Sequence, residues 1–209
     1  MVKAIPGKAV KRLTLYHYIL SDCTRQNVEH ISSQQIAGLL QIDDSQVRKD
    51  IALCQTSGRT NVGYKAAELK KAIEQALGFK EKKSAFIIGA GNLGRALARH
   101  TDFQDYGLDI VALFDTDPAK IDTLVNGRKV FHISELFHIS TRENLVNKQK
   151  VEIAILTVPG AAAQKSAELL LQSQIKYIWN FTPAVLSVPD NIRVYNENLM
   201  GNFLDFTKN

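Results

Sequence analysis

The chain reads Ser84-Ala85-Phe86-Ile87-Ile88, then Gly89-Ala90-Gly91-Asn92-Leu93-Gly94, then Arg95-Ala96-Leu97-Ala98-Arg99. The first run is continuously apolar and stops at a glycine, as a buried parallel strand does, and the last run predicts a helix. A Gly-x-Gly-x-x-Gly pattern lies between them, and an acidic residue, Asp115, ends the next predicted strand. This context is typical of the turn that binds a dinucleotide in a Rossmann fold.

Each residue of this pattern has a physical role in binding a dinucleotide. Gly89 permits the tight turn from strand to helix, Gly91 lets the backbone approach a pyrophosphate, and Gly94 lets helix and strand pack closely. The helix N-terminus offers unpaired N–H groups to the phosphates. Asp115 can accept hydrogen bonds from the adenosine ribose, and its charge disfavours the 2′-phosphate of NADP. A Rossmann-like fold that binds no dinucleotide is the alternative.

The rest of this half repeats the alternation of strand and helix. Apolar runs predict strands at 109–114, 152–156 and 177–181, and helical patterns cover 93–99, 133–137 and 161–174. We therefore expect an α/β domain with a doubly wound parallel sheet. Thr157-Val158-Pro159 follows a strand at the edge that lines the ligand crevice, and we expect it to contact the nicotinamide half. A simple strand-to-helix turn explains the same residues equally well.

The N-terminal part is predominantly helical. Apolar spacing predicts one helix over about residues 9–21. A second helix begins at Ser32 or Ser33, and a third runs from Asp43 or Asp44 to about Cys54. A helix, a short turn and a second helix form the helix-turn-helix arrangement.

The third helix has two different faces. Val47, Ile51 and Cys54 share its apolar face, and the polar side chains that point broadly the other way are Ser45, Gln46, Arg48 and Lys49. A recognition helix reads base edges with such groups, although an ordinary solvated helix has the same pattern. The turn-rich segment 56–64 predicts a hairpin wing whose Arg59 reaches phosphate or minor groove. A fourth helix over 66–77 ends at Gly78.

Composition places the chain among soluble globular proteins. Its 209 residues are 45% hydrophobic and 22% charged, and the mean hydropathy is -0.12. No run of about 18 apolar residues is present, so we expect no membrane span. The N-terminus lacks a signal-peptide pattern, which indicates a cytoplasmic protein. Cys23 and Cys54 do not have metal-site spacing, and we expect no metal.

The net charge of +5 is unevenly distributed. Residues 1–83 hold 14 Lys and Arg against 8 Asp and Glu, a balance of +6, whereas residues 84–209 hold 12 against 13, a balance of -1. A basic module joined to a neutral one indicates a nucleic-acid partner. A few excess lysines on a solvated face would give the same balance.

The predicted dinucleotide site lacks an obvious catalyst. No Tyr is followed four residues later by Lys, and the five His are scattered along the chain. A nicotinamide dehydrogenase needs a proton donor or acceptor, so we expect a ligand that is sensed and no enzyme. The alternatives are a small nicotinamide-dependent reductase with a basic oligomerisation module, and a CoA- or nucleotide-binding domain of similar topology.

Segments along nearly the whole chain resemble, in order, the Rex family of bacterial redox-sensing transcriptional repressors. They are Ile5-Pro6, Lys11-Arg12-Leu13 with Tyr16, Ile31-Ser32-Ser33 with Ile36-Ala37, Ser45-Gln46-Val47-Arg48-Lys49-Asp50, Val62-Gly63-Tyr64, Gly89-Ala90-Gly91-Asn92-Leu93-Gly94, Phe114-Asp115-Thr116-Asp117-Pro118, Ile153-Ala154-Ile155-Leu156-Thr157-Val158-Pro159, Asn180-Phe181-Thr182-Pro183 and Leu186-Ser187-Val188-Pro189.

The resemblance implies a homodimer that binds palindromic operator DNA and is released by NADH, in response to the NADH/NAD+ balance. It implies a winged helix-turn-helix domain over 1–83, a Rossmann NAD(H)-binding domain over 84–195 and a C-terminal helix over 196–209 that is exchanged between subunits. The expected cofactor-binding residues are Gly89, Ala90, Gly91, Asn92, Leu93, Gly94, Asp115, Thr116, Lys120, Thr157, Val158, Pro159, Asn180 and Leu199. The expected DNA-binding residues are Lys11, Arg12, Ser45, Gln46, Arg48, Lys49, Arg59 and Tyr64.

Three positions depart from the family pattern. The wing has Thr60-Asn61 after Arg59, where relatives usually show a second basic residue and Gly, although Asn can adopt positive φ. Cys54-Gln55 replaces an aromatic-Gly pair. Asn198 stands where relatives usually carry Asp, which puts a charged switch contact there in doubt.

Overall fold

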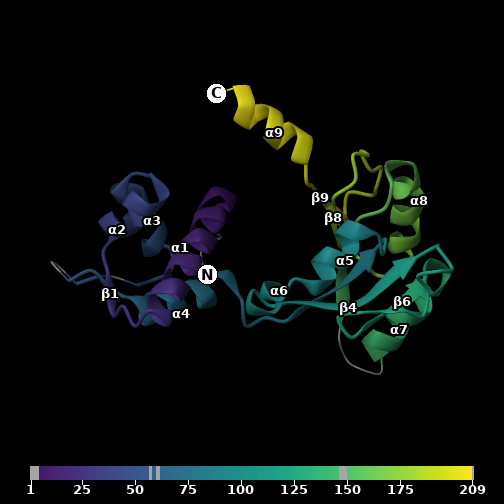
Figure 1. Ribbon diagram of the computed structural model, residues 1–209, viewed down its shortest axis with the longest axis horizontal. Coiled ribbons are helices and arrows are strands. Elements are labelled where there is room, and N and C mark those ends of the chain that lie inside the picture. Colours follow the sequence, from purple (N-terminus) through teal and green to yellow (C-terminus); the bar gives the residue numbers. More distant parts are fainter. Residues whose placement is uncertain (1–4, 57, 60–61, 146–149, 209) are drawn as a thin grey trace. The chain divides into compact units, whose positions relative to one another are not determined.

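The computed structural model describes residues 5–56, 58–59, 62–145 and 150–208, and the chain divides into two compact units, Met1–Glu81 and Lys82–Asn209 (Figure 1). The expected behaviour of Thr60 and Asn61 in the wing lies outside the described residues.

The first unit is a small helical domain with a short two-stranded sheet. Its elements are α1 (Gly7–Arg25), β1 (His30–Ile31), α2 (Ser33–Leu40), α3 (Asp44–Ala52), β2 (Tyr64–Lys65) and α4 (Ala66–Leu77). β1 and β2 pair antiparallel, so the strand that closes the wing is tied to the strand that leads into α2. Arg59 and Gly63 form an isolated antiparallel bridge within the wing.

Local capping explains where α2 and α3 begin. The Ser32 side chain accepts a hydrogen bond from the Gln35 N–H, and the Gln35 side chain accepts one from the Ser32 N–H. Asp43 caps α3 by accepting from the Ser45 N–H at 2.7 Å. Gln41 has a left-handed backbone conformation and makes the turn between the two helices. Capping of this kind satisfies backbone N–H groups that a helix start leaves unpaired.

The apolar face predicted for the third helix is confirmed, because Val47, Ile51 and Cys54 are all buried. The helix is shorter than predicted and ends at Ala52. The N–H groups of Leu53 and Cys54 bond to the carbonyl groups three residues before them, which tightens the last turn and ends the helix.

The second unit is built on a seven-stranded sheet with the order β5-β6-β4-β3-β7-β8-β9. The strands are β3 (Lys83–Ile88), β4 (Leu108–Asp115), β5 (Leu124–Val125), β6 (Arg128–His132), β7 (Val151–Leu156), β8 (Tyr177–Asn180) and β9 (Arg193–Asn196). The pairs between β6 and β9 are parallel, and β5 joins the edge antiparallel. The chain reverses its direction across the sheet between β3 and β7, which is the topological switch point of a doubly wound fold.

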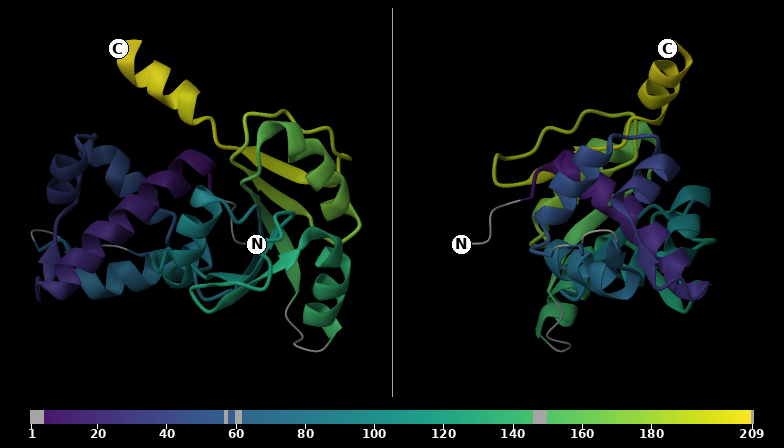
Figure 2. Two further views of the ribbon diagram at one scale, coloured as in Figure 1. Left: turned by 45° about the vertical axis from the view of Figure 1, so that its right-hand side comes forward. Right: turned by 90° about the vertical axis from the view of Figure 1, so that its left-hand side faces the viewer.

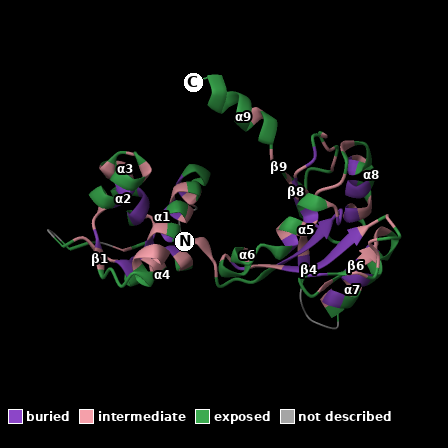
Figure 3. Cartoon of the chain, in the orientation of Figure 1, coloured by how far each residue is buried: buried purple, intermediate pink, exposed green. Residues whose placement is uncertain are grey.

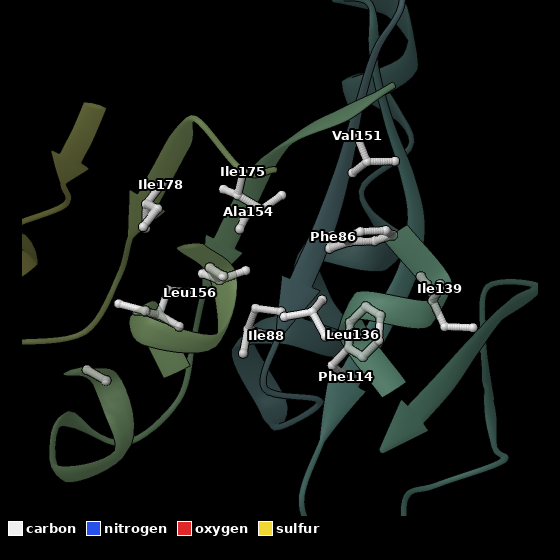
Figure 4. Close-up of a cluster of buried hydrophobic side chains, with 14 residues drawn as sticks. Phe86, Ile88, Phe114, Leu136, Ile139, Val151, Ala154, Leu156, Ile175 and Ile178 are labelled. Carbon is white, nitrogen blue, oxygen red and sulfur yellow. The ribbon is translucent and has the colours of Figure 1, made fainter. Parts of the chain in front are cut away.

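Helices cover both faces of this sheet (Figures 1 and 2). They are α5 (Asn92–Arg99), α6 (Asp102–Asp105), the 3-10 turn η1 (Ile133–Glu135), α7 (Leu136–Leu145) and α8 (Gly160–Leu171). The last helix, α9 (Leu199–Lys208), extends away from the sheet (Figure 1). Phe86 and Ile88 of β3 pack with α7 and α8, as the close-up in Figure 4 shows. Ala85 and Ile87 pack on the opposite face with Ala98 of α5. Burial on both faces explains the continuous apolar run of this strand.

The four strands predicted in this half are present. The sequence does not predict β5, β6 and β9. β6 and β9 carry mainly polar or partly exposed residues, and β5 has only two residues, so none of the three forms an apolar run. The last helix begins at Leu199, and each of its described residues remains at least partly exposed (Figure 3).

Candidate functional site

A crevice lies at the carboxyl edge of the sheet, at the switch point between β3 and β7. Its cavity measures about 400 Å³. The residues that line it are Ile88, Gly89, Gly91, Phe114, Asp115, Thr116, Asp117, Lys120, Ile133, Thr157, Val158, Pro159, Ala162 and Ser166. Ligands of open α/β sheets bind in this position.

Two glycines allow the turn after β3 to form. Gly89 has a φ of +103°, and a Cβ there would lie 2.9 Å from the carbonyl carbon of Thr157. A Cβ at Gly94 would lie only 1.9 Å from the Gly89 carbonyl oxygen. Gly91, by contrast, has open space where a Cβ would stand, and it provides no side chain to cap α5. The structure itself therefore requires glycine at 89 and 94, whereas at 91 only a ligand would require it.

We predict that Gly94→Ala destabilises the second unit by about 1–3 kcal/mol, because backbone must shift to admit the methyl group. Gly91→Ala is the matched control and should leave the free energy of unfolding unchanged within about 0.5 kcal/mol. Urea unfolding followed by the fluorescence of Trp179 measures both variants. Equal stability of the two variants would contradict the packing given to Gly94.

Asp115 carries a fixed negative charge at the crevice. One carboxylate oxygen accepts hydrogen bonds from the N–H groups of Thr116 and Asp117, at 2.8 and 2.9 Å. The other accepts from the Ala90 N–H at 2.7 Å and from Lys120 Nζ at 3.2 Å. Burial alone would raise the pKa of Asp115, but the hydrogen bonds from Asp117, Ala90 and Lys120 outweigh it and lower the pKa.

These four donors occupy the lone-pair directions of the carboxylate. Lys120 is the one donor on a long flexible side chain, and it also lies 3.5 Å from Asp117. Ribose hydroxyl groups that bind Asp115 must therefore share its oxygens or displace Lys120. The backbone donors remain and keep the carboxylate oriented toward the turn.

Thr157 connects the two strands at the switch point. Its N–H donates to the Ile88 carbonyl at 2.8 Å, and its hydroxyl donates to the Gly89 carbonyl at 2.9 Å. The hydroxyl is thus committed to the turn, while Val158 and Pro159 line the crevice beside it. Sequence reasoning missed six lining residues, which are Ile88, Phe114, Asp117, Ile133, Ala162 and Ser166. Three of them had a signal: Ile88 and Phe114 lie at the ends of the predicted strands, and Asp117 follows Asp115 two residues later.

Six expected cofactor-binding residues are not part of the crevice lining of this chain. Ala90, Asn92, Leu93 and Gly94 belong to the turn and first residues of α5 next to the lining glycines, whereas Asn180 and Leu199 lie elsewhere in the chain. Asn180 is fully buried, and its amide nitrogen donates to the Ala184 carbonyl and to Oδ1 of Asn196. Its own oxygen accepts from the N–H and hydroxyl of Thr182, so its hydrogen bonds fix the loop after β8. Leu199 lies at the start of α9 with 56% of its surface exposed.

The first unit contains a buried charged network behind α3. Arg12 donates from Nε and Nη2 to the two oxygens of Asp50, at 2.6 and 2.8 Å. The Tyr16 hydroxyl donates to Asp50 at 2.9 Å. The Gln46 side-chain amide nitrogen also donates to Asp50, at 3.0 Å. The Asp50 side chain is only 2% exposed. Arg12, which was expected to contact DNA, therefore joins α1 to α3 in this structure. Gln46, also expected to contact DNA, bonds to Asp50 within α3 itself.

The network shifts the pKa values of its members. Burial favours the neutral form of Asp50, but bonds from Arg12 and Tyr16 outweigh burial and lower the pKa of the carboxyl. Burial and the Asp50 carboxylate raise the pKa of Tyr16. The outward side chains of α3, by contrast, are solvent-accessible: Ser45, Arg48 and Lys49 are exposed. Lys11 and Arg59 are exposed as well, and Tyr64 is half-buried.

We predict that Asp50→Asn destabilises the first unit by about 1–3 kcal/mol at pH 7, because Arg12 and Tyr16 lose a charged acceptor. The folded pKa of Asp50 lies below the ordinary value of 3.8. The ionised carboxylate therefore stabilises the fold above that pH, and this stability is lost as the pH falls through the lowered pKa. Urea unfolding followed by helical circular dichroism should show the difference between variant and wild type shrinking below about pH 3.8.

Asp22→Asn is the control for this experiment, because Asp22 pairs with Arg25 at an exposed site on the same helix as Arg12. It should change stability by less than about 0.5 kcal/mol. If Asp50→Asn lowered the free energy of unfolding by the same amount down to pH 2, the charge of Asp50 would not stabilise the fold.

Known proteins match both units. The family model described as a CoA binding domain matches residues 80–184, and the one described as putative DNA-binding protein N-terminus matches residues 4–52. The redox-sensing transcriptional repressor Rex of Treponema denticola is 40% identical over 96% of this chain and 93% of its own length. The Rex of Porphyromonas gingivalis is 37% identical over 93% of this chain and 87% of its own length. The chain belongs to the Rex family.

Solved structures of Rex proteins share the fold. RSP, a Rex-family repressor, superposes with a TM-score of 0.81 at 29% identity, covering 98% of this chain and 93% of RSP. RSP in complex with NAD+ and operator DNA has a TM-score of 0.83 at 32% identity, covering 98% and 92%. RSP in complex with NADH has a TM-score of 0.83 at 30% identity, covering 98% and 93%. The predicted order of a winged helix-turn-helix unit and a Rossmann unit is confirmed.

The two units of this protein carry different features: the first has the exposed polar side chains of α3, and the second has the crevice at the sheet edge. None of the helices in the described ranges has the length and apolar character that a membrane span needs. His, Cys, Asp and Glu side chains in the same ranges nowhere gather in threes, as a metal site would need.

Proposed function

We propose that this Rex protein represses transcription by binding operator DNA as a homodimer and leaves the DNA when NADH occupies the crevice. The observation that carries the proposal is the crevice itself, with its glycine turn and fixed Asp115 carboxylate, in a chain that matches Rex repressors over almost its whole length. The first unit, Met1–Glu81, is the DNA-binding domain, and the second unit holds the NAD(H)-binding domain and the exchanged helix α9. These bounds differ by a few residues from the expected 1–83, 84–195 and 196–209, because Lys83 belongs to β3 and Asn196 to β9.

The nucleotide lies along the carboxyl edge of the sheet. The pyrophosphate contacts the turn and the start of α5, the adenosine ribose contacts Asp115 and Lys120, and the nicotinamide end lies toward Val158 and Pro159. The contact residues are Gly89, Ala90, Gly91, Asn92, Leu93, Gly94, Asp115, Thr116, Lys120, Thr157, Val158 and Pro159. We assign Asn180 the supporting role that its buried hydrogen bonds describe.

The DNA-contacting surface is formed by α3 and the wing. Ser45, Arg48 and Lys49 face the major groove, while Lys11, Arg59 and Tyr64 contact the backbone beside it. Arg12 and Gln46 act from behind α3 through Asp50, because that buried carboxylate already holds them. The +6 balance of residues 1–83 supplies the attraction to phosphate.

The homodimer is supported by the apolar surface of α9. Leu199, Met200, Phe203, Leu204 and Phe206 are each more than half exposed. Apolar side chains gathered on one short helix are typical of an interface. The exchanged helix then brings Leu199 to the nicotinamide pocket of the partner, which explains why it lies outside the crevice of its own chain.

The nucleotide is sensed and not consumed. The described residues that line the crevice include no His, Tyr or Cys, and the ionisable ones, Asp115, Asp117 and Lys120, are paired with one another. A proton donor or acceptor for a carbonyl substrate would have to come from such residues. A DNA partner also favours a cytoplasmic location.

We predict that two substitutions separate the two activities. Gly91→Ala adds a methyl group where the pyrophosphate must approach. It should therefore lower the affinity for NADH at least tenfold and leave DNA binding in the absence of nucleotide unchanged. Lys49→Gln should weaken DNA binding severalfold and leave NADH affinity unchanged. Calorimetry with NADH, and fluorescence anisotropy with a duplex that the wild type selects from a random pool, measure the two affinities.

The two variants are controls for each other, because each must retain one activity. Loss of both activities in either variant would indicate a folding defect, which the urea curves detect. If the wild type enriched no sequence from the pool, or bound no NADH, the proposed function would be wrong.

A further inference from the structure

Asp44 is an acidic residue at the start of the helix that we assign to the DNA major groove. The capping of α3 does not need it, because the neighbouring Asp43 accepts the bond from the Ser45 N–H. A carboxylate near phosphate is repelled by it. The favourable interaction of a carboxylate with the helix dipole is available from Asp43 as well. Asp44 therefore calls for another explanation.

Among the described residues, Asp44 forms an ion pair with an arginine on the same helix. Its Oδ2 lies 2.9 Å from Nη2 of Arg48, one turn further along α3. Its Oδ1 is buried and has no hydrogen-bond partner among the described residues. The Asp44 side chain is 25% exposed and that of Arg48 61%. The pair thus has an inner carboxylate and an outer guanidinium, and the carboxylate restricts a side chain that would otherwise be free to rotate.

The pair lies beside the strand that closes the wing. Tyr64 of β2 is close enough for both charges to act on its phenol: burial raises its pKa, Arg48 lowers it and Asp44 raises it. The Tyr64 ring in turn packs on Gly58, where a Cβ would come within 3.1 Å of it. Tyr64 therefore lies near the Asp44–Arg48 pair of α3 and next to Gly58 of the wing, on the surface that α3 and the wing would present to DNA.

We propose that Asp44 is a positioning residue for DNA specificity, which holds the Arg48 guanidinium toward a base edge and keeps it from binding phosphate. This inference rests on the proposed function, since it takes α3 as the DNA-reading helix. Arginine has five N–H donors and uses few of them on Asp44. The remaining donors can read a guanine, the base with two acceptors in the major groove. Competition from Asp44 lowers the affinity of Arg48 for any phosphate, and phosphate contacts carry no sequence information.

The test compares Asp44→Asn with the wild type on two duplexes, the one that the wild type selects from a random pool and a shuffled duplex of equal composition. Asparagine keeps the shape of the side chain and removes its charge. We expect affinity for the shuffled duplex to rise and the ratio between the two affinities to fall at least fivefold. The slope of log affinity against log salt should steepen by about one per subunit, because each freed Arg48 gains a phosphate contact.

Two further variants make the outcome specific to Arg48. Asp22→Asn removes the same charge from a pair with Arg25 elsewhere in this unit, and it should change neither the ratio nor the slope. In an Arg48→Gln background, Asp44→Asn should have no further effect on either quantity. A full effect in that background would mean that Asp44 acts by general repulsion, and it would overturn the inference.

Failure of the inference is distinguishable from failure of the proposed function. An Asp44→Asn variant that kept the wild-type ratio and slope would refute the role of Asp44 while leaving DNA recognition intact. A wild type that prefers no sequence would refute the proposed function itself. Circular dichroism of each variant verifies that α3 is folded.

Discussion

The carbonyl oxygen of Gly89 lies where the side chain of any other residue at position 94 would begin, 1.9 Å from an ideal Cβ. This close approach joins the end of β3 to the first turn of α5, and Thr157 ties the same turn to β7. The crevice exists because these three segments meet there. Asp115 then fixes the turn from the other side through the Ala90 N–H. The geometry of a nucleotide site thus follows from packing of the backbone, before any ligand is present.

The winged unit depends in the same way on a polar contact in its interior. Asp50 is buried, and its partners come from α1 and from α3 itself. A buried carboxylate is costly unless its hydrogen bonds are satisfied, and here Arg12, Tyr16 and Gln46 satisfy them. The result is that α3 is fixed against α1 by its inner face. Its outer face is left with Ser45, Arg48 and Lys49.

Much of this arrangement was predictable from sequence. Apolar runs that are buried on both faces predicted β3, β4, β7 and β8, and capping residues predicted the starts of α2 and α3. The edge strands were missed because their residues are partly solvated and follow no apolar pattern. Arg12 and Gln46 were assigned to DNA because their charge and polarity suit it, and sequence does not show that a buried Asp50 holds them. Asn180 was assigned to the cofactor for the same kind of reason, although its four hydrogen bonds are internal.

Control of DNA binding by a nucleotide requires that the ligand bind two states of the protein with different affinity. The crevice residues belong to the second unit and the α3 residues to the first, so the two ligands contact different parts of the chain. The most direct measurement is a titration of NADH, and separately of NAD+, into the complex of wild-type protein with its selected duplex. NADH should lower DNA affinity at least tenfold, a coupling of about 1.4 kcal/mol, and NAD+ should lower it much less. Equal effects of the two nucleotides, or no effect of either, would contradict a redox sensor.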